Sequence, residues 1–286
     1  MAEAFREALA DIRAIARDRR SGAADRAAAA LLRFVRAHLA RPAHLAALAA
    51  ALLRAQPSMA PLLNLAGLVQ RAVEQKPSSP QQLQRALIAK LRTFRQQLDR
   101  ANRQIARQFA ARLRPGAVVL TYSYSSTVLA ALVGARRKLA RVICSESRPQ
   151  LEGRQLAAEL ARAGIGVVLV ADAALPNRVR EADAVAVGAD AILPSPAGSR
   201  GAGAYVNKIG TRVLQEQSRR AGKPFYVLAD TSKILPAALE GHYRIEDRPG
   251  SELWRAAPGG VRVENRYFEK IPLRRGGAAS PVSSSA

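Results

Sequence analysis

The chain has 286 residues, of which 49% are hydrophobic, enough to bury the core of one or two globular domains. No apolar run approaches the roughly 18 residues that cross a bilayer, and the N-terminus lacks the apolar segment of a secretory signal. The single Cys144 excludes an internal disulfide. We therefore expect a cytoplasmic protein with no membrane partner. The net charge of +23 favours anionic ligands, but aromatic residues are only 5% and the arginines are spread along the chain, so we expect no specific nucleic-acid partner.

Residues 1 to 113 are predicted to be helical throughout, because Ala, Leu, Arg and Gln dominate this region. Breaks rich in Pro, Ser and Gly divide it at residues 20–23, 41–42, 56–58 and 76–80. At the last break, Ser79 is expected to cap a long helix with Pro80 as its first residue. Apolar residues then recur at helical spacing and predict one buried stripe of Leu83, Leu87, Leu91, Phe94, Leu98, Ile105 and Phe109.

From Arg114 on, short β-rich runs alternate with helical segments. Strands are expected at 117–121, 141–144, 167–170, 184–187 and 225–228. Helices are expected at 126–139, 152–163, 176–181 and 208–221. Such alternation predicts right-handed βαβ units and a mostly parallel sheet. The sequence therefore predicts an α/β protein with an all-helical N-terminal domain (1–113), a Rossmann-like ligand-binding domain (114–273) and a disordered tail (274–286).

Polar residues follow the predicted strands, at the edge where open α/β sheets bind ligands. After the first strand, Tyr122, Ser123, Ser125 and Ser126 precede a helix, where hydroxyls either cap the helix or help to hold an anion. After the second strand come Arg148 and Glu152. After the third comes Asp172, which either caps the next helix, the role we favour, or contacts a ligand.

The apolar run 184–187 ends in Gly188-Ala189-Asp190 and is the most informative segment. A lone Asp at a strand end is often only a helix cap, but Asn207 and Lys208 follow a loop of small residues (195–203), so we favour a ligand role for Asp190. Lys208 is expected in the first turn of a helix, close to Asp190. An acid at a strand end and a cation at a helix start predict a site for a small phosphorylated ligand. The three histidines leave no metal-ligand spacing, so we expect no metal and no cofactor.

Eight short segments occur in a specific order along most of the chain. They are Ser21-Gly22-Ala23, Pro57-Ser58-Met59-Ala60-Pro61-Leu62, Tyr122-Ser123-Tyr124-Ser125, Glu146-Ser147-Arg148-Pro149 with Glu152-Gly153, Val187-Gly188-Ala189-Asp190, Asn207-Lys208-Ile209-Gly210-Thr211, Lys223-Pro224-Phe225-Tyr226-Val227 and Asn265-Arg266-Tyr267-Phe268. In this order they resemble the translation initiation factor 2B alpha/beta/delta family, which also contains methylthioribose-1-phosphate isomerase and archaeal ribose-1,5-bisphosphate isomerase.

The resemblance implies a helical domain on a Rossmann-like domain, a ligand between them, and a homodimer. The isomerase members convert an aldose 1-phosphate to a ketose 1-phosphate, with a cysteine after the first strand and an aspartate after the fourth. The matching positions here are Ser123 and Asp190. The candidate ligand-binding residues are Arg20, Ser21, Gly22, Ala23, Tyr122, Ser123, Ser125, Ser126, Arg148, Glu152, Asp190, Asn207 and Lys208.

Three residues depart from the isomerase pattern: Ser123 replaces a cysteine, Gln56 an arginine and Glu152 a glutamine. A thiol with a pKa of about 8.5 exchanges protons at neutral pH, whereas a serine hydroxyl is far less acidic. These departures favour an initiation factor 2B-like protein that binds a sugar phosphate or nucleoside monophosphate without turnover. The alternative is an aldose–ketose phosphate isomerase in which Asp190 carries the proton at the carbon centre and Ser123 only hydrogen-bonds the substrate.

Overall fold

The computed structural model describes residues 2–17, 23–38, 41–195, 203–273 and 279–282. The chain divides into two compact units. The first, here called the helical unit, comprises Met1–Arg100 and Ser232–Arg244; the second, the sheet unit, comprises Ala101–Thr231 and Ile245–Ala286. The division falls inside a helix at residue 100, whereas the sequence predicts a boundary at 113. Residues 232–244 belong to the helical unit although they follow the last predicted strand.

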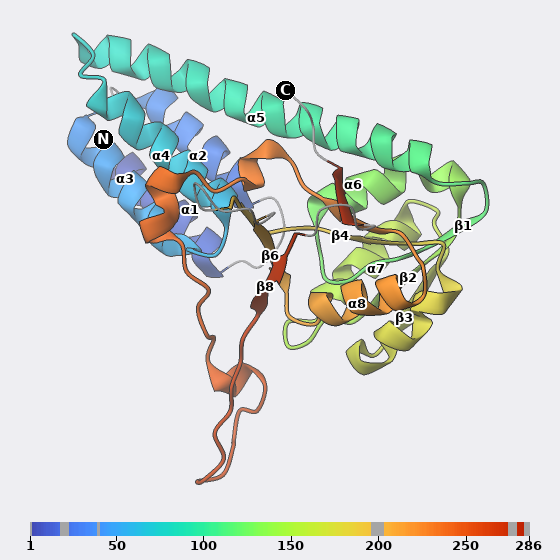
Figure 1. Ribbon diagram of the computed structural model, residues 1–286. Coiled ribbons are helices and arrows are strands. Elements are labelled where there is room, and N and C mark those ends of the chain that lie inside the picture. Colours follow the sequence, from blue (N-terminus) through green and yellow to red (C-terminus); the bar gives the residue numbers. More distant parts are fainter. Residues whose placement is uncertain (1, 18–22, 39–40, 196–202, 274–278, 283–286) are drawn as a thin grey trace. The chain divides into compact units, whose positions relative to one another are not determined.

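The helical unit contains α1 (Ala2–Arg17), α2 (Ala23–Ala37), α3 (Pro42–Ala55), α4 (Ala60–Glu74), the first part of α5 (Pro80–Arg112) and the short η4 (Ala237–His242) (Figure 1). α3 packs against α4 and α1, and α1 packs against α2. The expected helix start at residue 80 is confirmed, because the Gln82 backbone N–H donates to Ser79 Oγ. No helix in the described ranges is both long and apolar enough to cross a bilayer.

The apolar stripe of α5 is buried as expected, except that Leu98 is only partly buried. Because α5 continues from the helical unit into the sheet unit, the stripe serves two cores. Its last members, Ile105 and Phe109, belong to the core of the sheet unit.

All five predicted strands join one sheet, and its strands pair in parallel in the order β3-β2-β1-β4-β7-β9. The strands are β1 (Ala117–Leu120), β2 (Leu139–Ser145), β3 (Val167–Val170), β4 (Ala184–Val187), β7 (Phe225–Leu228) and β9 (Ala279–Val282). The strand order reverses between β1 and β4, which is where open parallel sheets bind ligands. β9 pairs with β7 and lies within 274–286, where the sequence predicts disorder.

A second, antiparallel sheet of β5 (Ala191–Leu193), β6 (Ala204–Lys208) and β8 (Phe268–Pro272) was not predicted. The prediction of a helix from residue 208 is wrong at its start, because Lys208 is the last residue of β6 and α8 (Thr211–Arg220) begins three residues later. β6 pairs with β5 through residues 204–206 and with β8 through residues 204–208, and the pairing with β8 extends the strand through Lys208.

The other helical segments are α6 (Ser126–Gly134), η1 (Arg136–Lys138), α7 (Glu152–Arg162), η2 (Asp172–Glu181), η3 (Thr231–Lys233) and η5 (Gly250–Glu252). Two of them differ from the prediction. α6 stops at Gly134, and the 3₁₀ helix η1 occupies 136–138 before β2 begins at Leu139. η2 is a 3₁₀ helix that contains Pro176, a residue that cannot donate the backbone hydrogen bond of a regular α-helix.

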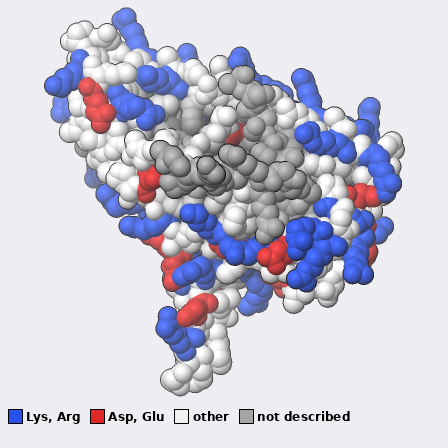
Figure 2. All heavy atoms as spheres, in the orientation of Figure 1, with Lys and Arg blue, Asp and Glu red and all other residues white. Residues whose placement is uncertain are grey.

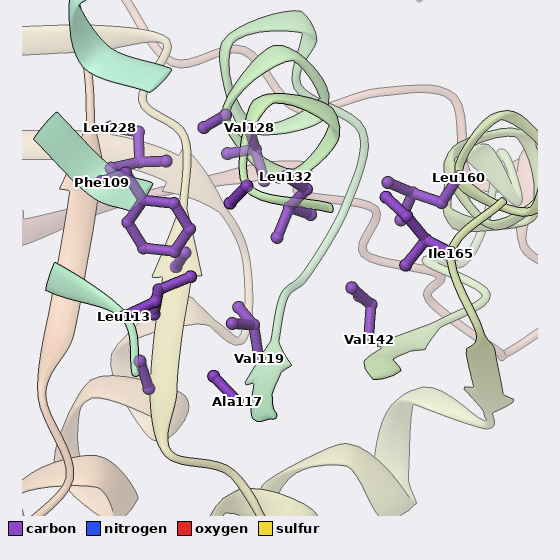
Figure 3. Packing of buried hydrophobic residues seen from close by; sticks show 14 of the residues in the cluster. Phe109, Leu113, Ala117, Val119, Val128, Leu132, Val142, Leu160, Ile165 and Leu228 are labelled. Atoms are coloured by element: carbon purple, nitrogen blue, oxygen red, sulfur yellow. The ribbon is translucent and has the colours of Figure 1, made fainter. Parts of the chain in front are cut away.

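Both faces of the parallel sheet are covered. Val119 faces a core that includes Phe109, Val128, Leu132 and Leu160 from α5, α6 and α7 (Figure 3). Its neighbours Val118 and Leu120 face a second core formed with η2, α8 and β6 through Leu175, Leu214 and Tyr205. Burial on both faces explains why these strands are continuous apolar runs in the sequence.

The basic residues lie mainly on the surface. Figure 2 shows Lys and Arg side chains spread over the displayed face, with Asp and Glu side chains between them. On this face the positive charge is distributed rather than gathered at one element.

Candidate functional site

Three of the predicted site residues, on three different elements, meet at the carboxyl edge of the parallel sheet. Ser123 follows β1, Glu152 begins α7 and Lys208 ends β6. Ser123 Oγ donates to Glu152 Oε1 at 2.9 Å, and Lys208 Nζ lies 2.7 Å from the same oxygen. The Glu152 and Lys208 side chains are only 14% and 3% exposed. The three form a buried cluster, here called the Ser123–Glu152–Lys208 cluster, in which one carboxylate oxygen receives both contacts.

A buried aromatic ring completes the surroundings of Lys208. The ring of Tyr267 lies 4.7 Å from Lys208 Nζ, within the range of a cation–π interaction. The Tyr267 hydroxyl in turn bonds the Glu252 carboxylate. The sequence indicates Tyr267 only as part of the family marker Asn265-Arg266-Tyr267-Phe268, and no local pattern links it to Lys208.

Ser123 is held in a backbone conformation that non-glycine residues seldom adopt. Its φ is 63°, and Ser147 in the loop after β2 has the same value. The left-handed conformation costs about 1–2 kcal/mol for such residues. The two loops are tied together because the Ser123 N–H donates to Ser147 Oγ at 3.1 Å, and Ser147 is fully buried. This bond helps to fix the position from which the Ser123 hydroxyl reaches Glu152.

Asp172, after β3, fixes the loop after β2. Its carboxylate accepts from Ser145 Oγ at 2.6 Å, from the Ser147 N–H at 2.8 Å and from the Arg148 N–H at 2.6 Å. The prediction that Asp172 caps a helix is wrong, since η2 has no side-chain cap. Arg148 is exposed and contributes its backbone N–H to this arrangement.

Gly153 allows α7 to begin very close to the end of β2. A Cβ at this position would lie 1.8 Å from the Ser145 carbonyl oxygen and 2.8 Å from Ser147 Oγ. Only glycine can occupy a position so close to the end of β2. Glu152 is the residue directly before this glycine. The close approach thus places the Glu152 carboxylate within reach of the loop after β1.

The hydroxyls of the loop after β1 have structural partners. Tyr122 donates to the Ile209 carbonyl at 2.8 Å, and burial raises the pKa of Tyr122, so that its hydroxyl stays protonated. Ser125 caps α6 by accepting from the Val128 N–H at 3.4 Å, which is one of the two roles open to it from sequence. Ser126 is the first residue of α6.

Asn207 lies on β6 of the small antiparallel sheet, and Asp190 directly precedes β5 of the same sheet. The Asp190 N–H donates to the Val206 carbonyl at 2.8 Å, which joins the segment between β4 and β5 to β6. Asn207 is buried and its Nδ2 donates to Thr211 Oγ1 at 3.0 Å, at the start of α8. The sequence predicts Lys208 close to Asp190 but gives no sign of its ion pair with Glu152, which the structure shows.

The remaining predicted site residues belong to the helical unit. Arg20, Ser21 and Gly22 lie outside the described residues. In the sheet unit, residues 196–202 of the small-residue loop also lie outside them. Ala23 is the buried first residue of α2. Gln56 is buried and donates through Nε2 to the Ile15 carbonyl at 2.8 Å.

The part of the chain that the structure describes offers neither a reactive thiol in place of the one missing at Ser123 nor a metal centre. Cys144 lies within β2 with 1% of its surface exposed, and burial raises its pKa to about 12. A thiol in this state is a packing residue rather than a nucleophile. Within the described ranges, no three His, Cys, Asp or Glu side chains gather as a metal site.

Known proteins with similar sequences include both isomerases and proteins named after the initiation factor. Ribose 1,5-bisphosphate isomerase of Archaeoglobus fulgidus is 34% identical over 233 residues, 77% of this chain and 69% of that protein. A Pyrococcus horikoshii protein named putative translation initiation factor eIF-2B subunit 2-like is 34% identical over 77% of this chain and 73% of its own length. Methylthioribose-1-phosphate isomerase of Symbiobacterium thermophilum is 34% identical over 66% of this chain and 56% of its own length.

The fold is also found among solved structures. The translation initiation factor eIF-2B of Pyrococcus horikoshii OT3 matches 93% of this chain and 91% of its own with a TM-score of 0.74 and 30% identity. The 5-methylthioribose 1-phosphate isomerase of the same organism, at 24% identity and a TM-score of 0.70 over 93% of this chain and 80% of its own, shares the fold. The sequence profile of the initiation factor 2 subunit family matches residues 17–273. The chain therefore belongs to the initiation factor 2 subunit family.

Proposed function

We propose that this protein is an aldose–ketose isomerase that acts on a sugar phosphate at the carboxyl edge of its parallel sheet. The observation that carries the proposal is the convergence of Ser123, Glu152 and Lys208, with Asp190 joined to β6 by a backbone hydrogen bond. The 34% identity to proteins named as isomerases supports the same class of reaction. Binding without turnover, which the sequence alone favours, is less well supported by these similarities.

The chemistry of such a reaction sets what the site has to supply. In an aldose 1-phosphate, C1 carries both the phosphate oxygen and the ring oxygen, so there is no free carbonyl. Conversion to the ketose 1-phosphate breaks the bond from C1 to the ring oxygen and the C2–H bond, and forms a new C1–H bond. The ring oxygen gains a proton and the C2 hydroxyl loses one, so no oxidant or reductant is needed. The reaction therefore requires acid–base groups at both the carbons and the oxygens.

Asp190 is proposed as one of these acid–base groups, as the family resemblance implies. Asn207, Tyr122 and Arg148 are proposed to position the sugar. The segment Arg20-Ser21-Gly22-Ala23 and the start of α6 at Ser125 and Ser126 are proposed to hold the phosphate groups, because the N–H groups at a helix start attract anions. We further propose a cytoplasmic homodimer that needs no cofactor and has no specific nucleic-acid partner.

The experiment is a direct assay of turnover. The purified protein is incubated with ribose 1,5-bisphosphate and, separately, with methylthioribose 1-phosphate, and ketose formation is followed by NMR. We expect one of the two to be converted, and we expect Asp190→Asn to lower kcat by about 100-fold or more. Glu216→Gln, at an exposed position on α8, is the control and is expected to keep the wild-type rate.

A second candidate is an initiation factor 2B-like protein that binds a sugar phosphate or a nucleoside monophosphate without converting it. Ser123 favours this candidate, because a hydroxyl stands where the isomerase pattern has a thiol. Failure of the wild-type protein to convert either sugar phosphate, together with binding of one of them or of AMP in calorimetry, would overturn the isomerase proposal and support this one.

A further inference from the structure

The two departures from the isomerase pattern in the sheet unit contact each other. Ser123 stands where that pattern has a proton-carrying thiol, and its hydroxyl donates to Glu152 at 2.9 Å. A titratable carboxylate therefore lies one hydrogen bond from the position of the missing thiol. From the sequence, each change looks like a separate loss; in the structure, they are one local arrangement.

The two oxygens of Glu152 have different surroundings. Oε1 receives both the Ser123 hydroxyl and the Lys208 ammonium. Oε2 is buried and has no hydrogen-bond partner among the described residues. A buried acceptor without a donor destabilises a folded protein, so such an atom calls for a reason. A substrate that presents its reacting hydrogen to Oε2 would supply one.

We infer that Glu152 is the second acid–base group of this site, which acts on the carbons of the substrate; the inference rests on the proposed isomerase function. Oε2 takes the proton from C2, and the electron pair of that bond forms the C1–C2 double bond as the bond to the ring oxygen breaks. Asp190 protonates the ring oxygen and thus serves the oxygens, whereas the isomerase alternative drawn from the sequence has it carry the proton at the carbon centre. Glu152 then returns its proton to C1, while Asp190 takes the proton of the C2 hydroxyl and leaves the carbonyl.

Ser123 and Lys208 are positioning residues in this arrangement. Their contacts hold Oε1 and so fix the plane of the carboxylate. Because Lys208 is engaged with Glu152 and with the ring of Tyr267, its positive charge is matched inside the protein. The alternative is that Glu152 only neutralises Lys208, and a neutral isostere separates the two roles.

The test compares Glu152→Gln with the wild type and with the control Glu216→Gln. The amide keeps an oxygen for Ser123 and Lys208 but cannot accept and return a proton. We expect kcat to fall by about 10²- to 10⁴-fold, KM to change by less than about threefold, and the acidic limb of the kcat–pH profile to disappear. Glu152→Gln with at least one third of the wild-type kcat and an unchanged pH profile would overturn the inference.

A double variant tests whether the two groups share one role. Ser123→Cys combined with Glu152→Gln recreates the thiol and the amide of the isomerase pattern. We expect it to be about tenfold faster or more than Glu152→Gln alone, with a rate that rises as the pH approaches the thiol pKa of about 8.5. A double variant no faster than Glu152→Gln would overturn the shared role.

Three further outcomes are distinguishable. If Glu152→Gln does not fold, Glu152→Asp keeps the charge but withdraws the oxygen by one methylene; a tenfold loss of kcat supports the inference and an unaltered kcat overturns it. If the wild-type protein forms no ketose, the isomerase proposal fails and this inference with it. If the wild type forms ketose and the Glu152 variants are equally fast, only this inference fails.

Discussion

The Ser123 hydroxyl donates to the same carboxylate oxygen of Glu152 that receives the Lys208 ammonium. Ser123 and Glu152 are 29 residues apart in the sequence and lie on different βα units. Their contact depends on the pairing of β1 with β2, and on the bond that ties Ser123 to Ser147. The relationship has consequences for stability as well as for chemistry.

Replacing Lys208 with Met is expected to destabilise the protein by about 3–5 kcal/mol, because Glu152 would be left as a buried charge without its cation. Adding Glu152→Gln to this variant is expected to restore part of the loss. Urea unfolding measures both. Arg266→Met, which removes an exposed ion pair with Asp247, is the control and is expected to cost less than about 1 kcal/mol. A Lys208→Met variant as stable as this control would contradict the ion pair's burial.

Gly153→Ala is expected to be strongly destabilising, since its Cβ would lie 1.8 Å from a backbone oxygen that can move only with the end of β2. The start of α7 would shift, and Glu152 with it, so a loss of substrate conversion should accompany the lower melting temperature. Gly259→Ala serves as the control, because nothing lies within 4 Å of a Cβ at that position. Equal melting temperatures for the two variants would show that the approach of α7 to β2 is looser than described.

Asp172→Asn is expected to loosen the loop after β2. The carboxylate accepts three hydrogen bonds there, and an amide can replace at most part of them. We expect a loss of about 1.5–3 kcal/mol and faster hydrogen exchange at the amides of Ser147 and Arg148. Exchange rates at these two amides that equal those of the wild type would exclude a positioning role for Asp172.

The pH dependence of stability should report on Cys144. Burial raises the pKa of its thiol from 9.0 to about 12, so the unfolded state loses a proton at a lower pH than the folded state. The contribution is therefore fully present below pH 9 and is lost as the pH rises from 9 to 12. Between pH 7 and pH 10, the wild type should lose about 1.4 kcal/mol more than Cys144→Ala.

Urea unfolding at the two pH values measures this difference, and modification by iodoacetamide offers an independent check. The native thiol is expected to resist iodoacetamide at pH 8 and to react only after unfolding. Parallel pH dependence of the wild type and Cys144→Ala would rule out the buried, neutral thiol.

Much of the fold could be predicted because its signals are local. The five apolar runs became β1, β2, β3, β4 and β7 at nearly the predicted positions, and Ser79 caps α5 as expected. The errors lie where tertiary pairing overrides local preference. Lys208 joins a strand because it pairs with Phe268 of β8. The 3₁₀ helix around Pro176 has a local cause instead, since proline cannot donate the hydrogen bond of a regular α-helix.

The candidate site was only partly predictable for the same reason. Ser123, Glu152 and Lys208 were each singled out by their positions after strands or by the family resemblance. Their mutual contact, the support from Asp172 and the ring of Tyr267 could not be inferred, because the left-handed residues and close approaches that create them leave no periodic signal.

By itself, the sequence determined that this chain is an α/β protein with a helical N-terminal region, a parallel sheet and polar residues at its carboxyl edge. These properties follow from composition and from the spacing of apolar residues, which act over a few residues at a time. Only the tertiary structure decided that Lys208 pairs with Glu152, and that Glu152 in turn holds Ser123. Such contacts depend on which strands are neighbours and on how each loop leaves its strand, and both are set by the packing of the whole unit.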